Sequence, residues 1–114
     1  MTQTNTRIGI MQIAIILLTI ATALVHLQRG IEFGMAMFIA NGIGYLVLVA
    51  ALYAPIAFLA PYRKWIRWAL IAFTLVTIVG WIAIGDKAEM IGWIDKAIEV
   101  VLVVLLFLDG RRNQ

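Results

Sequence analysis

Three ionisable side chains interrupt an apolar run near the C-terminal end of the sequence. Residues 90–108 contain Asp95, Lys96 and Glu99 among aliphatic and aromatic residues. As a helix the run is long enough to cross a bilayer, and a charge at that depth is unfavourable unless it is paired or faces water. We therefore expect the rest of the chain to place polar groups at the same depth, which constrains the fold strongly.

The composition indicates an integral membrane protein. Apolar residues make up 64% of the 114 residues and charged residues 13%, whereas soluble domains are roughly 45–50% apolar. The sequence has no cysteine, which excludes disulfides and thiolate metal sites. Its net charge of +3 is small, and the basic residues cluster beside apolar runs. This pattern indicates a lipid bilayer as the partner and not a nucleic acid.

Four apolar segments are each long enough to form a transmembrane helix. We expect helices at about residues 8–27, 35–53, 65–84 and 90–108, joined by short loops into a single domain over residues 1–114. Two glycines and two charges predict a turn at residues 28–34. Pro55 and Pro61 predict a break near Ala54, and Gly110 is typical of a helix C-cap. The predicted fold class is an all-α integral membrane protein with an up-down-up-down bundle.

The basic residues divide unevenly between the two ends of this bundle. An even number of spans places both termini and the loop between the second and third helices on one side. That side carries six of the nine basic residues, namely Arg7, Arg63, Lys64, Arg67, Arg111 and Arg112. The other side carries Arg29, Lys87 and Lys96. Because Lys and Arg favour the cytoplasm, both termini are predicted to be cytoplasmic, with the protein in the inner (plasma) membrane.

Polar residues of all four predicted helices fall at matching depths. Counted inward from the outer ends at about 1.5 Å per residue, His26 and Trp81 lie within about 5 Å of the surface. A layer at about 8–11 Å contains Thr22, Asn41, Thr77 and Asp95, and a layer at about 12–15 Å contains Thr19, Tyr45, Thr74 and Glu99. The cytoplasmic half is almost wholly aliphatic. The bundle is therefore predicted to be sealed at its cytoplasmic end and polar toward the outside.

These layers define a candidate polar cluster, which comprises Glu99, Asp95, Lys96, His26, Arg29, Asn41, Tyr45, Thr22 and Thr77. Asp95 and Glu99 share a helix face at i,i+4 spacing, and Lys96 can reach either carboxylate. One interpretation is an ion pair with Lys96 or Arg29 that fixes helix packing. The other is a ligand, ion or proton site. Glu99 lies near the midplane, so we expect it to be protonated or paired with the first helix.

His26 is the only histidine of the chain. It is either a hydrogen-bonding group near the membrane surface or a proton relay or tetrapyrrole ligand. Haem held by two histidines needs a second chain. A metal held by His26, Asp95 and Glu99 needs the first and fourth helices to be neighbours, and no motif indicates one. No metal is predicted, and no cofactor is assigned.

Two further patterns concern packing and the membrane surface. Ala36, Ala40 and Gly44 form a stripe of small residues on the second helix, which indicates close helix packing inside the chain or an oligomer interface. Aromatic residues gather at both predicted membrane surfaces, with Tyr53, Tyr62, Trp65 and Trp68 at one end and Trp81 and Trp93 at the other. This distribution is typical of interfacial belts.

Length and number of spans are similar to those of the small multidrug resistance transporters. Those proteins carry a glutamate in their first helix, whereas the acids here lie in the fourth. The Gly-Asn-rich and Phe-box pattern of fluoride channels is also absent. Neither family therefore implies a function for this chain.

No Ser-His-Asp set, phosphate loop or metal-ligand spacing is present, so we expect no enzymatic activity. The first hypothesis is a non-enzymatic interaction or accessory subunit that associates with itself or with a larger membrane complex. The alternative is a small oligomeric transporter or ligand-binding protein that uses Glu99 and Asp95 as proton- or cation-coupled groups. A third hypothesis is a haem- or pigment-binding protein that uses His26.

Overall fold

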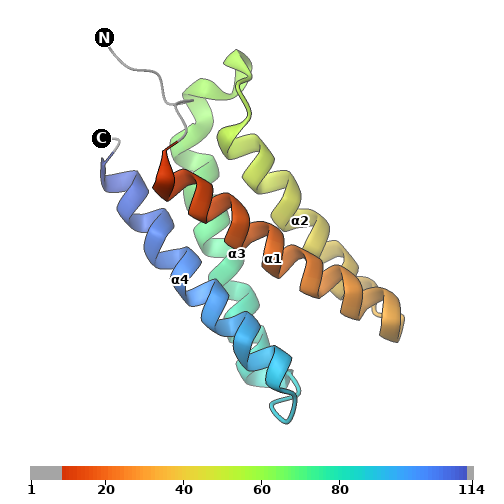
Figure 1. Ribbon diagram of the computed structural model, residues 1–114. Helices are drawn as coiled ribbons and strands as arrows, with labels where there is room; N and C mark the ends of the chain where they lie inside the picture. Colours follow the sequence, from red (N-terminus) through yellow and green to blue (C-terminus); the bar gives the residue numbers. More distant parts are fainter. Residues whose placement is uncertain (1–8, 113–114) are drawn as a thin grey trace.

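The computed structural model describes residues 9–112, and these form four α-helices and one short 3-10 helix without any strand (Figure 1). The elements are α1 (Ile10–Phe33), α2 (Ala36–Tyr53), η1 (Ala57–Tyr62), α3 (Arg63–Ile84) and α4 (Met90–Arg112). The prediction of an all-helical chain is confirmed. Residues 1–8, with the predicted polar tail and Arg7, and residues 113–114 lie outside the described part of the chain.

Within residues 9–112, three segments are long and apolar enough to cross a membrane. They are Ile10–Phe33, Ala36–Tyr53 and the combined η1–α3 segment Ala57–Ile84. α4 has 23 residues, but its apolar run holds Asp95, Lys96 and Glu99, so its composition alone does not mark it as a span. The length and composition of the first three segments are those of a membrane protein.

The helices form a closed ring in which α1 contacts α2 and α4, and α3 contacts the same two helices. α1 and α4 run in opposite directions, because Gln12 contacts Asp109 and Thr22 contacts Glu99. We call the end where α1 begins and α4 ends the terminal end, and the opposite end the distal end. The α1–α2 pair crosses the α3–α4 pair, so the two pairs diverge toward the distal end (Figure 1).

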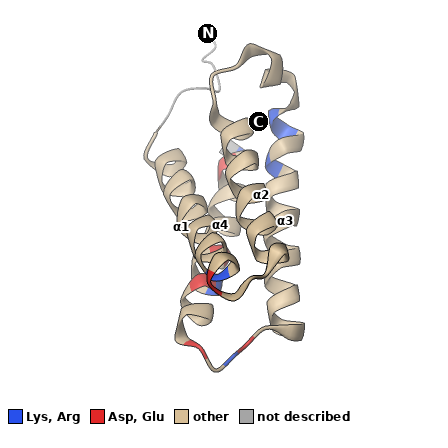
Figure 2. Ribbon diagram, turned by 90° about the vertical axis from the view of Figure 1, so that its right-hand side faces the viewer, with Lys and Arg blue, Asp and Glu red and all other residues tan. Residues whose placement is uncertain are grey.

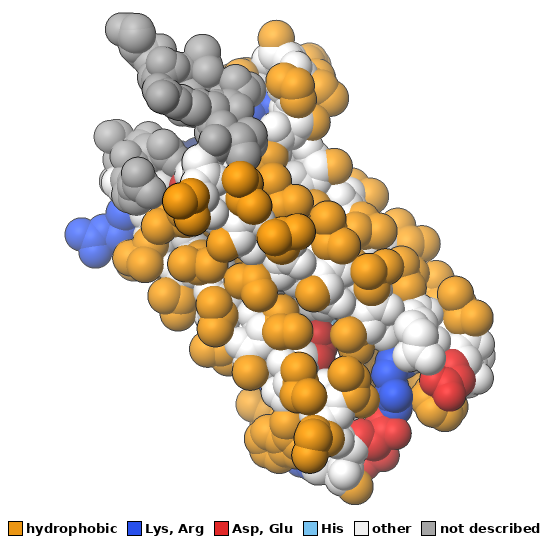
Figure 3. Space-filling view, viewed as in Figure 1, with side chains coloured by type: hydrophobic (Ala, Val, Ile, Leu, Met, Phe, Trp, Pro, Cys, Tyr) orange, Lys and Arg blue, Asp and Glu red, His pale blue; other side chains and the backbone are white. Residues whose placement is uncertain are grey.

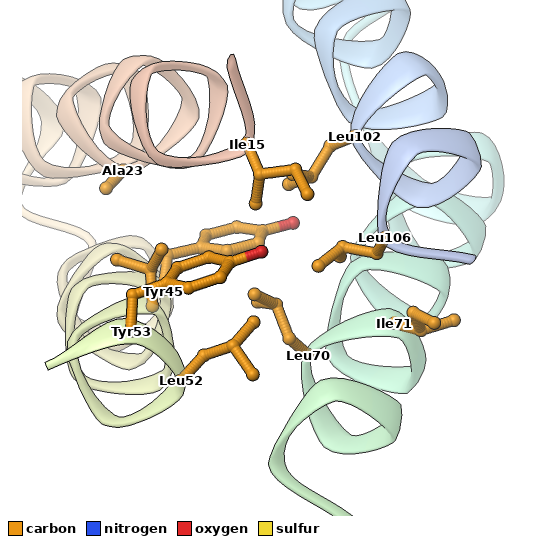
Figure 4. Packing of buried hydrophobic residues seen from close by; sticks show 10 residues of the cluster. Ile15, Ala23, Tyr45, Leu52, Tyr53, Leu70, Ile71, Leu102 and Leu106 are labelled. Atoms are coloured by element: carbon orange, nitrogen blue, oxygen red, sulfur yellow. The ribbon is translucent and has the colours of Figure 1, made fainter. Parts of the chain in front are cut away.

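The apolar core lies between the helices and is dominated by branched aliphatic side chains. The fully buried members include Ile15, Leu70, Leu102 and Leu106. In Figure 4 the rings of Tyr45 and Tyr53 project into the same space, with their hydroxyl groups directed toward the centre of the bundle. The face in Figure 3 is also largely hydrophobic, which is favourable against acyl chains but not against water.

Two predicted helix ends are wrong. α1 continues through residues 28–33, where a turn was predicted, and Gln28 donates to Glu32 at 2.7 Å along the continued helix. The left-handed backbone falls on Gly34 instead, with φ of 66°. α4 likewise passes through Gly110 and ends at Arg112. Gly110 is not a C-cap; it lies beside α3, where a Cβ would approach Cδ of Arg67 to 3.0 Å.

The other boundaries lie close to the predicted ones. α2 ends at Tyr53 and Ala54 is extended, so the predicted break at this position is confirmed. The segment that follows forms η1 and leads into α3, which begins at Arg63 rather than at residue 65. Pro61 lies within η1, where the short 3-10 helix leaves few backbone hydrogen bonds for it to remove.

Gly42 allows α1 and α2 to approach closely. A Cβ at this buried position would lie 2.8 Å from the carbonyl oxygen of Ala23 and 2.7 Å from Cγ of Leu27. We expect Gly42→Ala to lower the free energy of unfolding by about 1–3 kcal/mol, because the contact must open. Reversible unfolding in mixed micelles, followed by tryptophan fluorescence, measures this change.

Gly80→Ala is the matched control within α3. Within residues 9–112, no neighbouring atom lies within 4 Å of a Cβ built at Gly80, and alanine favours a helix over glycine by up to about 1 kcal/mol. The two substitutions should therefore have opposite signs. Equal effects at both positions would contradict the close approach of α1 and α2.

Candidate functional site

Lys96 bridges two carboxylates of its own helix. Its Nζ lies 2.5 Å from Oε1 of Glu99 and 3.2 Å from Oδ2 of Asp95. All three side chains are buried, and Glu99 is completely inaccessible. Residues three apart on a helix are neighbours, which allows the contact with Glu99. In Figure 2 most of the ribbon is tan, and Lys, Arg, Asp and Glu occupy only a few short segments of it.

The second oxygen of Glu99 is held by two other helices. Oε2 accepts hydrogen bonds from Oγ1 of Thr22 in α1 at 2.9 Å and from the hydroxyl of Tyr45 in α2 at 2.8 Å. With the bond from Lys96, the carboxylate accepts three hydrogen bonds, which suits its ionised form. The contact with the first helix is thus a hydrogen bond from the uncharged hydroxyl of Thr22, and the counter-charge comes from Lys96 on the same helix as Glu99.

His26 lies beside the other carboxylate. Its Nδ1 is 3.9 Å from Oδ2 of Asp95 and 2.8 Å from the carbonyl oxygen of Thr22. Because a carbonyl oxygen only accepts, Nδ1 carries a proton in this arrangement. Within residues 9–112, the buried Oδ1 of Asp95 accepts no hydrogen bond. Asp95 is therefore less completely solvated by the protein than Glu99.

The remaining predicted residues are Asn41 and Thr77, which join two helices, and Arg29, which lies elsewhere. Asn41 of α2 donates from Nδ2 to Oγ1 of Thr77 in α3 at 2.9 Å, and this bond links the two helices. Thr77 in turn donates to the carbonyl oxygen of Phe73 within α3. Arg29 is not part of the cluster, since it pairs with Glu89 in the loop before α4. In Figure 3 basic and acidic side chains meet where the two helix pairs diverge.

The cluster also meets the geometric condition for a metal site, because α1 and α4 are neighbours. One ligand atom from each of His26, Asp95 and Glu99 lies within 4.8 Å of the others. The ammonium of Lys96, however, already contacts both carboxylates. A divalent ion would have to displace it, which makes a proton or a monovalent cation the better match for this donor set. With His26 neutral, Lys96 leaves one of the two negative charges unbalanced.

A second buried polar cluster at the terminal end was not predicted. Asp109 is completely inaccessible and accepts hydrogen bonds from Gln12 at 2.5 Å and from the hydroxyl of Tyr53 at 3.1 Å. Arg67 of α3 lies 3.4 Å from the same carboxylate. The prediction of an almost wholly aliphatic interior at this end missed Asp109 and its partners, and the buried Tyr53 does not belong to an interfacial belt.

The spacing along α4 contains the signal that could have revealed this cluster. The inward face consists of Asp95, Glu99, Leu102, Leu106 and Asp109, at steps of four, three, four and three residues. This is the spacing of one helix face. Asp109 follows the same face as Glu99, although its neighbours Gly110 and Arg111 had placed it in the tail.

Comparisons of the chain with protein-family models, with curated proteins and with solved structures found no match. What distinguishes the candidate site is its chemistry. Two carboxylates, one lysine and one histidine are enclosed between apolar helices, and hydrogen bonds from α1 and α2 complete the group.

Proposed function

We propose that all four helices, α4 included, cross the inner membrane as an up-down-up-down bundle with both termini in the cytoplasm. The inward direction of Asp95, Lys96 and Glu99 supports this topology, because an enclosed ion pair removes the main objection to α4 as a span. The excess of Lys and Arg at the terminal end supports the orientation. Arg63 and Arg67 lie there at the start of α3.

Within that membrane, the protein acts as a non-enzymatic assembly subunit that associates with itself or with a larger membrane complex. The observation that carries this proposal is the internal pairing of the charges in α4. Lys96 neutralises Glu99 and contacts Asp95, and Thr22 and Tyr45 complete the coordination of Glu99. These groups therefore serve to hold the helices in register, as polar contacts do in membrane bundles.

The outward face of α3 is the surface best suited to association. α3 with η1 buries 17% of its apolar window, against 28% for α1 and for α2. The face presents two small side chains at helical spacing, Ala69 and Ala72, both of which are exposed. Small residues let a second helix approach closely.

The test compares Ala72→Phe on this face with Ala50→Phe on the exposed side of α2. Single-molecule photobleaching in liposomes gives the association state at several protein-to-lipid ratios. We expect Ala72→Phe to weaken association by about tenfold or more and Ala50→Phe to leave it unchanged, since a bulky ring blocks only the close contact. A lone monomer at every ratio, with no partner in material purified from the native membrane, would refute the proposal.

A second candidate function is the binding or transport of a proton or a monovalent cation. The unpartnered Oδ1 of Asp95 favours it, as does the single unbalanced charge of the cluster when His26 is neutral. A proton on His26 or a small cation at Asp95 would restore neutrality, which a low-dielectric environment favours.

Proteoliposomes with an imposed pH or Na+ gradient test this second function. Asp95→Asn removes the unbalanced charge and should abolish flux, whereas Asp86→Asn in the exposed distal loop should leave flux unchanged. Flux that is equal for a folded Asp95→Asn variant and the unmodified protein would exclude this function.

A further inference from the structure

We infer that a groove between α3 and α4 at the terminal end binds the headgroup of an anionic phospholipid. The groove has a volume of about 620 Å3. Its basic lining residues are Lys64, Arg67 and Arg111, and its apolar lining includes Trp68, Leu106 and Phe107. The inference rests on the proposed topology, which places this groove at the headgroup level of the cytoplasmic leaflet.

The charge of the groove is opposite in sign to that of a phosphodiester. Among the described residues that line it, none is acidic. Asp109 lies behind the groove and neutralises one of the three cations through Arg67, so about two positive charges remain for a ligand. Nε of Arg67 is buried and donates to no acceptor within residues 9–112, so the protein does not satisfy every donor of this guanidinium.

The apolar wall distinguishes a lipid from a free anion. The rings of Trp68 and Phe107 meet edge to face, with centroids 6.4 Å apart, and both side chains are about half exposed. A soluble phosphate gains nothing from this wall, whereas a phospholipid can place its phosphate between Lys64 and Arg111 and its acyl chain along the rings. Basic pockets between cytoplasmic helix ends recognise acidic headgroups in this way.

Gly110 keeps the groove open on the side of α4. A Cβ at this position would approach Cδ of Arg67 to 3.0 Å. Any side chain here would therefore press on the arginine that lines the groove. This role replaces the C-cap that the sequence predicted for Gly110.

The test uses the full chain reconstituted with equal amounts of phosphatidylglycerol and phosphatidylcholine that have identical acyl chains. After mild detergent extraction, mass spectrometry measures the ratio of the two lipids retained. We expect the unmodified protein to retain more phosphatidylglycerol than phosphatidylcholine. In the Lys64→Gln/Arg111→Gln variant this retention ratio should be about tenfold lower. Millimolar inorganic phosphate should not displace the lipid.

A second variant distinguishes a specific lipid site from non-specific electrostatic attraction of anionic lipid to basic residues. Trp68→Ala/Phe107→Ala keeps every charge and removes the apolar wall, and it should also reduce retention several-fold. Lys87→Gln and Phe58→Ala, which change exposed residues outside the groove, are the controls. Equal enrichment in all variants, or a loss that follows charge alone, would overturn the inference. Cysteine labelling at the two ends of the chain's last helix reports the topology separately, so failure of this inference is distinguishable from failure of the proposed topology.

Discussion

Replacing Lys96 with methionine is expected to lower the free energy of unfolding by about 3–5 kcal/mol. The substitution retains most of the aliphatic length of the side chain and removes the ammonium that contacts both carboxylates. Asp95 and Glu99 then remain buried without a counter-charge, and breaking a buried pair from one side has a cost of this size. Reversible unfolding in mixed micelles, followed by tryptophan fluorescence, measures the loss.

Two comparisons make this result specific. Lys87→Met, in the exposed distal loop, should change stability within experimental error. Adding Asp95→Asn and Glu99→Gln to Lys96→Met removes the stranded charges and should recover most of the loss, because a neutral buried group avoids the desolvation penalty. If Lys96→Met were no more harmful than Lys87→Met, the ionic cluster would not hold the bundle together.

Asp109→Leu should lower the free energy of unfolding by about 3 kcal/mol. The carboxylate is the acceptor for Gln12 and Tyr53 and the counter-ion of Arg67. Its removal leaves a largely buried guanidinium without its partner, and two polar groups without this acceptor. The same unfolding measurement applies.

A double-mutant cycle tests whether this loss comes from the Arg67–Asp109 ion pair or from the introduced leucine side chain. Arg67→Met alone leaves the carboxylate of Asp109 without its counter-charge, whereas Arg67→Met/Asp109→Leu removes both charges. The double variant should therefore be more stable than the sum of the single losses predicts, with a coupling of about 1–3 kcal/mol. Additive losses would show that Arg67 and Asp109 do not interact.

The helices and the layers of their polar residues were predictable from the sequence. Apolar runs of bilayer length mark the helices, and the positions of Tyr45 and Glu99 along their helices place them in one layer, with Thr22 in the adjacent layer. This holds because depth depends only on the rise per residue. Lys96 and Glu99 were close in sequence, so their contact required only a helix.

Other features could not be read from the sequence, because they depend on how far helices extend and which faces meet. The glycines and charges of residues 28–34 favoured a turn, yet only Gly34 adopts the left-handed backbone. The longer α1 carries Arg29 toward Glu89, away from the cluster in which it was expected. Asp109 was assigned to the C-terminal tail from its sequence neighbours. Its burial depends on Gln12, Tyr53 and Arg67 from three other helices, which the sequence around Asp109 does not show.

Cysteine labelling tests most directly whether α4 crosses the bilayer with its charged residues enclosed inside the bundle. The chain has no cysteine, so a single introduced cysteine reports its own side of the membrane without a background signal. A membrane-impermeant maleimide should label Asp86→Cys in intact cells and Arg111→Cys only after permeabilisation, since both positions are exposed, Asp86 in the loop before α4 and Arg111 near its C-terminal end. Labelling of both positions from the same side would show that α4 does not cross the bilayer.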